Sequence, residues 1–298
     1  MSAAETRPYA PPDAVRPSRW DSTRKGGQLR GVGRFFRSEL GMVFRRRRNV
    51  VLLAILALVP VLISVAVKVG GHPRHAGSIF NSITDNGLFA TLAAFLVISP
   101  FFLPLVISVV AGDSVAGEAS TGTLRYLLVI PAGRTRLLAV KLAAILAWCL
   151  ACVTAVAVVG ILAGLIFFPA GDVTLLSGRA ISYSAGLGRV ALVLLYVAGT
   201  ALTVGAIGLF VSTMTEVPIA AMAATLTLTI VSEVADAVPQ LSAIHGWLPS
   251  HYWLKWVDLL RDPMITDGIT TGLWVALAYV ALFVALAWAR FSGKDVTS

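Results

Sequence analysis

The chain has 298 residues, of which 57% are hydrophobic and only 13% are charged, and its mean hydropathy is +0.83. An average soluble domain carries about 25% charged residues, so this composition excludes a soluble globular enzyme. Two cysteines exclude a disulfide framework and a four-thiolate metal site.

The positive charge lies almost entirely at the start of the chain. The formal net charge is +9, and residues 1–49 hold 12 Lys and Arg against 4 Asp and Glu. A basic segment in front of an apolar body is typical of the cytoplasmic flank of a membrane protein. Residues 1–27 are too poor in apolar residues to pack and are predicted to be a disordered tail. Because the tail lacks interleaved aromatic residues, we expect no nucleic-acid partner.

The next segment, 28–48, has the pattern of an amphipathic helix. Apolar residues recur at spacings of three and four over 28–44, and arginines fall together on an adjoining flank. The pattern favours a helix in the membrane interface, with an ordinary helix packed on a neighbouring subunit as the alternative. Four arginines at 45–48 follow and favour the interface, because they mark a cytosolic edge. The residues assigned to this interface helix are Arg30, Arg34, Phe36, Arg37 and Leu40.

The remainder, 49–298, is predicted to be an all-α domain with six transmembrane helices. Spans of roughly 20 residues match six apolar segments. The third is longer than a membrane core, so we expect one helix that starts along the inner surface. Ser99, Pro100 and Pro104 should kink the second. The six segments are 50–69, 88–111, 137–168, 190–213, 218–238 and 272–289.

The distribution of basic residues predicts the orientation. With the N-terminus inside, the inner flanks hold 18 Lys and Arg and the outer connections hold 6. Lys and Arg are retained on the cytoplasmic side, so the pattern places both termini in the cytoplasm. We therefore expect a multi-pass protein of the plasma (inner) membrane.

An aromatic segment precedes the last span. Residues 250–262 place apolar side chains on one helical face, with Ser250 as the expected N-cap. Amphipathic aromatic residues favour membrane interfaces, so 239–268 is predicted to contain a re-entrant or interfacial helix on the outer side. Its aromatic residues are Trp247, Tyr252, Trp253 and Trp256.

No catalytic signature occurs in the sequence. A GxxxxGK[ST] loop, an HExxH motif and a GxSxG motif are all absent, so we expect neither enzymatic activity nor a bound cofactor or metal in this chain. His72 and His75 favour solvated loop residues over a metal pair. Cys149 and Cys152, within the third span, favour packing residues over a soft-metal pathway.

The connection after the second span carries the most informative pattern. Residues 112–141 combine acidic Asp113 and Glu118, a short leucine set, a stop at Pro131 and basic residues beyond it. A short helix with a leucine face and a hard stop is typical of a docking element for another protein.

This stretch resembles the membrane subunits of type 2 ATP-binding-cassette exporters. The resemblance rests on the string E-x-x-x-G-T-L, then L-L, then P-x-x-R and a downstream Lys, and it extends over roughly 28–290 through the amphipathic helix, the six spans and the outer aromatic segment. The matching positions are Glu118, Gly122, Thr123, Leu124, Leu127, Leu128, Pro131, Arg134 and Lys141.

The resemblance implies that 112–136 is the coupling region, seated in a groove of a separate ATPase subunit. It implies an assembly of two membrane chains, identical or paralogous, with two ATPases that bind the ATP and Mg. It also implies an outward pathway between the chains, lined by the second and fifth spans, for an amphipathic drug, lipid-like or peptide substrate. The candidate pathway residues are Ser99, Pro100, Thr225, Thr229, Glu233 and Asp236.

The two membrane acids near the outer end of the fifth span have two interpretations. Glu233 and Asp236 could attract a cationic substrate at the exit, or they could be interfacial acids in water or paired with Lys255 or Arg261.

Two other classes of function remain alternatives. A membrane sensor or immunity protein would explain the outer aromatic segment but leaves the E-x-x-x-G-T-L stretch without a purpose. A proton-driven transporter would need an acid near mid-membrane, and every acid we identify lies near an edge.

Overall fold

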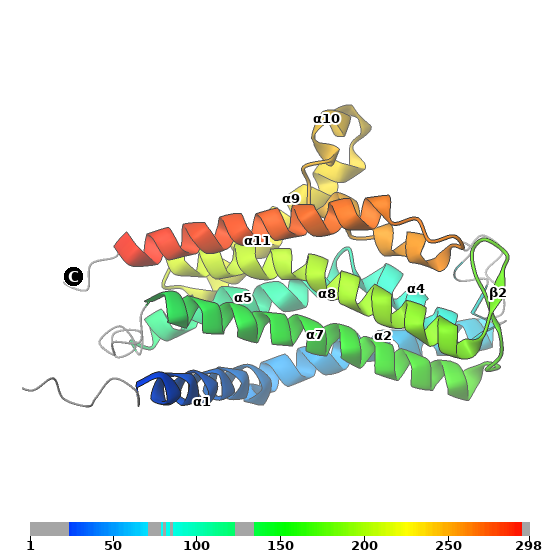
Figure 1. Cartoon of the computed structure of the whole chain (residues 1–298), viewed down its shortest axis with the longest axis horizontal. Helices are drawn as coiled ribbons and strands as arrows, with labels where there is room; N and C mark the ends of the chain where they lie inside the picture. The colour runs from blue at the N-terminus through cyan, green and yellow to red at the C-terminus, as the bar shows by residue number, and fades with distance from the viewer. Residues whose placement is uncertain (1–23, 71–78, 80–81, 84–85, 123–133, 294–298) are drawn as a thin grey trace, which may run out of the picture.

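The computed structural model of the chain describes residues 24–70, 79, 82–83, 86–122 and 134–293. Within these residues the fold is mostly helical (Figure 1). Six of the described helices are long and apolar enough to cross a membrane. This confirms the predicted all-α class and the number of candidate spans. The predicted tail over 1–23 lies outside the described residues.

The first two helices meet at the arginine run. α1 spans Arg24–Arg45 and α2 spans Arg47–Gly70, with Arg46 between them outside either helix. α1 therefore begins four residues before the predicted boundary at 28. It packs against α7 (Arg134–Phe167) as well as α2, and Phe44 meets the ring of Trp148 edge-on at 5.4 Å between centroids. One face of α1 is thus covered by the chain's own helices.

The second apolar segment is broken into two helices, whereas the sequence predicts one kinked span. α4 (Leu88–Ile98) and α5 (Phe102–Ser120) are separated by a turn at 99–101. Pro100 lies in this turn and Pro104 in the first turn of α5, where a missing N–H costs no helical hydrogen bond. α5 also continues to Ser120, nine residues beyond the predicted end at 111. The acids at 113 and 118 are therefore helical.

α7 and α8 (Tyr183–Met214) form the centre of the bundle. α7 is one helix of 34 residues, which confirms the prediction of a single long helix. A short antiparallel hairpin, β1 (Val173–Thr174) and β2 (Ala180–Ile181), connects α7 to α8. α8 packs against α5, α7, α9 (Pro218–Ala237) and α11 (Asp267–Gly293). The apolar window of α8 is 67% buried, compared with 17% in α9 and α11, so those two helices leave broad apolar faces uncovered.

The connection between α9 and α11 differs from the predicted α-helix over 250–262. It contains η1 (Pro239–Leu241), α10 (Ser242–His245), η2 (Ser250–Tyr252) and η3 (Lys255–Leu260), of which all but α10 are 3₁₀ helices. The predicted N-cap is wrong, because the hydroxyl of Ser250 lies 2.7 Å from that of Ser232 on α9 and does not cap a helix. α10 stands out from the bundle beyond α11 (Figure 1).

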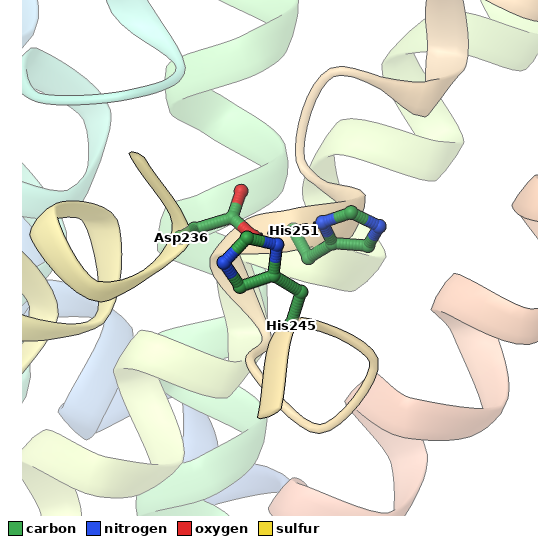
Figure 2. A group of neighbouring side chains, drawn as sticks. All are labelled: Asp236, His245 and His251. Atoms are coloured by element: carbon green, nitrogen blue, oxygen red, sulfur yellow. Dashed lines mark hydrogen bonds and ion pairs between the residues drawn. The ribbon is translucent and has the colours of Figure 1, made fainter. Parts of the chain in front are cut away.

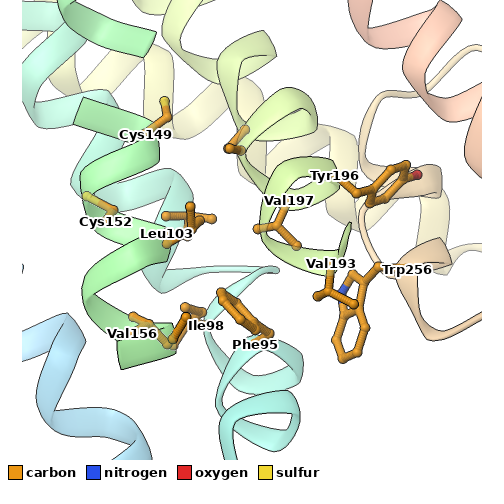
Figure 3. Packing of buried hydrophobic residues seen from close by; sticks show 14 of the residues in the cluster. Phe95, Ile98, Leu103, Cys149, Cys152, Val156, Val193, Tyr196, Val197 and Trp256 are labelled. Atoms are coloured by element: carbon orange, nitrogen blue, oxygen red, sulfur yellow. The ribbon is translucent and has the colours of Figure 1, made fainter. Parts of the chain in front are cut away.

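The interior is apolar and includes part of this connection. Trp256 is fully buried and meets Phe95 of α4 edge-on, with 6.5 Å between ring centroids. Cys149 and Cys152 lie in the same packed region of α7 (Figure 3) and both are free thiols. Their burial among apolar side chains supports the packing interpretation.

Candidate functional site

A buried ionic cluster joins α1, the end of α5 and the start of α7. The Nζ of Lys141 lies 2.6 Å from Oε1 of Glu118 and 3.4 Å from Oε1 of Glu39, and it donates to the carbonyl oxygen of Ser114 at 2.8 Å. Lys141 is 2% exposed and Glu39 is 5% exposed. An ammonium has three N–H donors, so Lys141 has one acceptor for each.

Two carboxyl groups, those of Glu39 and Glu118, face the single ammonium of Lys141. Burial raises the pKa of the Glu39 carboxyl above its usual value, and the proximity of Lys141 opposes this shift. The negative charge of Glu118 adds to the rise. Burial therefore makes ionisation of the Glu39 carboxyl more costly than it is in water.

A second set of charges lies beside the first. Asp113, on the same helix as Glu118, forms ion pairs with Arg46 and with Arg48, whose Nη2 lies 2.9 Å from Oδ2. Asp113 is 9% exposed. The amide of Asn49 donates to the carbonyl oxygen of Val43 at 2.8 Å and so holds the junction between α1 and α2.

Together the two sets balance in charge. We define the charged cluster as three acids and three bases: Glu39, Asp113, Glu118, Arg46, Arg48 and Lys141. All of them except Arg48 line a cavity of about 40 Å³, which has room for a water molecule. The ion pairs of the charged cluster hold four helices together: α1, α2, α5 and α7.

The predicted coupling residues are described only in part. Glu118 and Lys141 meet directly. Gly122, the last residue described after α5, has a φ of +72°, a left-handed conformation that glycine adopts at no steric cost. Arg134 begins α7, with its side chain outside the described residues. Five positions lie outside them entirely: Thr123, Leu124, Leu127, Leu128 and Pro131.

The segment predicted as the interface helix forms α1. Arg34 and Arg37 are exposed, whereas Phe36 and Leu40 are half-buried. Arg30 lies in α1, but its side chain is outside the described residues. The residue that the periodicity missed is Glu39, the single acid among the residues of 24–48.

Three of the six predicted pathway residues, Ser99, Thr225 and Thr229, are buried in this chain. Ser99 donates to the carbonyl oxygen of Phe95 at 2.6 Å. Thr225 and Thr229, one turn apart on α9, are buried and donate to the carbonyls four residues earlier in the helix. Within this single chain their hydroxyls are therefore occupied by backbone hydrogen bonds.

The structure gives a partner for one of the two acids near the end of α9. Asp236 contacts His251, with 2.7 Å between Oδ1 and Nδ1, a partner that none of its interpretations included. Glu233 is half-buried one turn earlier.

The four aromatic residues of the predicted interfacial segment divide into two groups. Trp247 is 77% exposed, while Tyr252, Trp253 and Trp256 are buried against the chain's own helices. The hydroxyl of Tyr196 on α8 donates to the carbonyl oxygen of Tyr252 at 2.7 Å. The buried three therefore anchor the connection to the bundle.

Comparisons with known proteins place the chain in a family. Residues 74–297 match the family described as "Protein of unknown function (DUF2705)", and this match covers about three quarters of the chain. The chain belongs to this family of proteins. The match includes α4 through α11, with Glu118, Lys141 and Asp236, and leaves α1 and α2 outside it. Curated proteins give no match.

Proposed function

We propose that this chain is the membrane-spanning permease subunit of an ATP-binding-cassette exporter. In this proposal it forms half of an outward pathway for an amphipathic drug, lipid-like or peptide substrate, and a separate ATPase subunit supplies the energy. The observation that carries the proposal is the buried contact of Lys141 with Glu118 and Glu39, because it ties together the elements on either side of the predicted coupling region.

A force on the predicted coupling region would act on two helices at once. Residues 123–133 connect α5 to α7, and the pair of Glu118 and Lys141 joins these two helices just beside that connection. A partner that pushes on the connection would therefore move both helix ends as one unit. Because the pair is buried, it resists separation more than a screened surface pair would. The contact of Glu39 extends the unit to α1.

The basic residues support an inward orientation for this end of the bundle. α1, the start of α7 and the C-terminal end of α11 lie at the same end (Figure 1). The arginines at 45–48 lie at the α1–α2 junction beside Asp113. In this orientation the chain lies in the plasma membrane with both termini on the cytoplasmic side. The charged cluster then faces the compartment that holds ATP.

A second permease chain would complete the pathway. The apolar window of α9 is only 17% buried, and large exposed side chains line it. Ile219, Leu228 and Val231 are at least 50% exposed. An apolar face of this size is suited to lipid or to another membrane helix.

Purification of the chain from its native host in mild detergent, followed by mass spectrometry, tests the proposal. We expect a stoichiometric partner with a GxxxxGK[ST] loop. Glu118→Lys should remove it, because the new lysine repels Lys141 and reverses the charge at the end of α5. Leu124→Asp should also remove it, since the change lies in the predicted docking segment and leaves the charged cluster intact.

Asp172→Lys is the matched control. Asp172 is exposed between α7 and β1, beyond the far end of α7 from Lys141, so its charge reversal is distant from the predicted coupling region. The partner should stay with this variant. A wild-type chain that reproducibly purifies without any ATPase would contradict the proposal and favour a membrane sensor.

A further inference from the structure

Three ligand-bearing side chains converge near the end of α9. Asp236 comes from the last turn of α9, His245 from the end of α10 and His251 from η2 (Figure 2). One oxygen of Asp236 and one nitrogen of each histidine all lie within 4.8 Å of one another. We refer to these three residues as the histidine cluster.

The distances suit a transition-metal ion. Zn²⁺ binds histidine nitrogen at about 2.0–2.1 Å and carboxylate oxygen at about 2.0–2.2 Å, so two ligand atoms of a tetrahedral site are roughly 3.3 Å apart. Oδ1 of Asp236 lies 2.7 Å from Nδ1 of His251 and 3.9 Å from Nδ1 of His245. These distances lie on either side of the required one, and small rotations of the side chains would reach it.

The hydrogen bond of His245 prepares its other nitrogen for a ligand. Nε2 of His245 lies 3.1 Å from the carbonyl oxygen of Val238. A carbonyl oxygen only accepts, so Nε2 carries the proton and, in the neutral ring, Nδ1 carries a lone pair. That lone pair is directed to the region of the Asp236 carboxylate. A metal ion bound between the ring nitrogen and the carboxylate would contact both, and a backbone carbonyl behind the ring is the usual support of a metal-binding histidine.

The loop that carries the histidines is held in place by the bundle. The hydroxyl of Tyr252 donates to the carbonyl oxygen of Gly246 at 3.1 Å, and the hydroxyls of Ser232 and Ser250 are 2.7 Å apart. The ring of Tyr252 also meets that of His251 edge-on at 5.1 Å. The ligands are therefore positioned before an ion arrives, which lowers the entropic cost of binding.

The cluster is open to solvent. The side chains of His245, Asp236 and His251 are 18%, 24% and 33% exposed. An ion from water can enter, and its remaining coordination position can hold water or an outside ligand.

We propose that Asp236, His245 and His251 bind a divalent transition-metal ion, with Zn²⁺ as the best match. Two imidazoles and one carboxylate favour such an ion over Mg²⁺ or Ca²⁺, which prefer oxygen ligands. The bound ion fixes the 239–252 segment to the end of α9. This inference concerns the chain alone and does not depend on an ATPase partner.

Zn²⁺ titration of the full chain, purified in detergent without a polyhistidine tag, tests the site. We expect one Zn²⁺ per chain, not displaced by Mg²⁺. His245→Ala and His251→Ala should each weaken binding by at least about tenfold, and Asp236→Asn should weaken it as well. Size-exclusion chromatography checks that each variant stays folded.

The control removes the other two histidines. His72→Ala/His75→Ala deletes as many imidazoles but none of the cluster, so binding should be unchanged. Co²⁺ bound to the wild-type chain should show the strong visible absorption of four-coordinate cobalt, a readout that needs no variant. Absence of a stoichiometric Zn²⁺ in the wild type, or equal loss of affinity in the control, would overturn the site and leave a His–Asp ion pair in its place.

Discussion

The charged cluster and the histidine cluster are built on opposite principles. In the charged cluster, Glu39, Glu118 and Lys141 come from three helices and lie largely buried, and Lys141 has an acceptor for each of its N–H groups. In the histidine cluster, partly exposed side chains come mainly from a connection, and one carboxylate oxygen of Asp236 faces an Nδ1 atom of each histidine. The charged cluster therefore fixes the positions of the helices relative to one another. The histidine cluster, in contrast, is accessible to a ligand from solvent.

The largest expected effect concerns the buried lysine. Lys141→Met removes the cation from between two buried carboxylates and should destabilise the chain by about 3–5 kcal/mol. Thermal unfolding in detergent measures this as a lower midpoint. Lys68→Met is the control: its ammonium lies 6.0 Å from the ring centroid of Phe168, a contact that contributes no more than about 1 kcal/mol.

A triple variant sharpens the same test. Replacing Glu39, Glu118 and Lys141 together by methionine removes every member of the buried triad at once, so it should recover most of the lost stability. If Lys141→Met unfolds at the wild-type temperature, the triad does not hold the helices as described.

The next effect should appear in the histidine cluster. Zn²⁺ at a hundred times its dissociation constant should stabilise the wild-type chain by about 2.7 kcal/mol. The same concentration should leave the melting temperature of His245→Ala/His251→Ala unchanged. Equal stabilisation of both proteins would show that the ion binds elsewhere.

Two glycines give a smaller pair of effects with opposite signs. Gly122 has a positive φ, so Gly122→Ala should cost about 1–2 kcal/mol. Gly41 lies within α1 with open space around it, and Gly41→Ala should stabilise the chain by about 0.5–1 kcal/mol. Chemical denaturation of the two variants side by side measures both changes, and a stabilising Gly122→Ala would contradict the left-handed conformation.

The smallest effect is the pH dependence from Glu39. Its pKa is raised above 4.5 in the folded chain, so between the two pKa values the folded state binds more protons than the unfolded state. This contribution to stability is present at low pH and is lost as pH rises above 4.5 through the raised pKa. Glu39→Gln should lack it, so the stability difference between the two proteins should change with pH over that range and level off beyond it.

The sequence predicts the apolar helices well because their signal is local. The third span needs only a run of apolar residues, and α7 follows as a single helix. The sequence predicts a kink at the place where the structure has a break between α4 and α5. Ser99 and Pro100 indicate that the helix is irregular there, but they do not indicate whether it bends or ends. The predicted α-helix over 250–262 formed 3₁₀ turns because the burial of Trp256, a tertiary contact, sets the path of that segment.

Both clusters depend on contacts between residues far apart in the sequence. Glu39 and Lys141 are 102 residues apart, and no periodicity pairs them. The sequence does single out Glu39, because it is the single acidic residue in the basic stretch 24–48. The spacing of Asp236, His245 and His251 matches no familiar metal motif, so it required the fold of the connection between α9 and α11.

Site-specific photocrosslinking tests the central claim most directly. A photoreactive residue at Ser120, exposed at the end of α5, should crosslink in cells to a subunit with a GxxxxGK[ST] loop, identified by mass spectrometry. The same residue at Trp247, exposed in the connection before α11, should not capture that subunit. Capture of an ATPase from position 120 alone is the result that the exporter account predicts. Capture from neither position, or from position 247 alone, would contradict it.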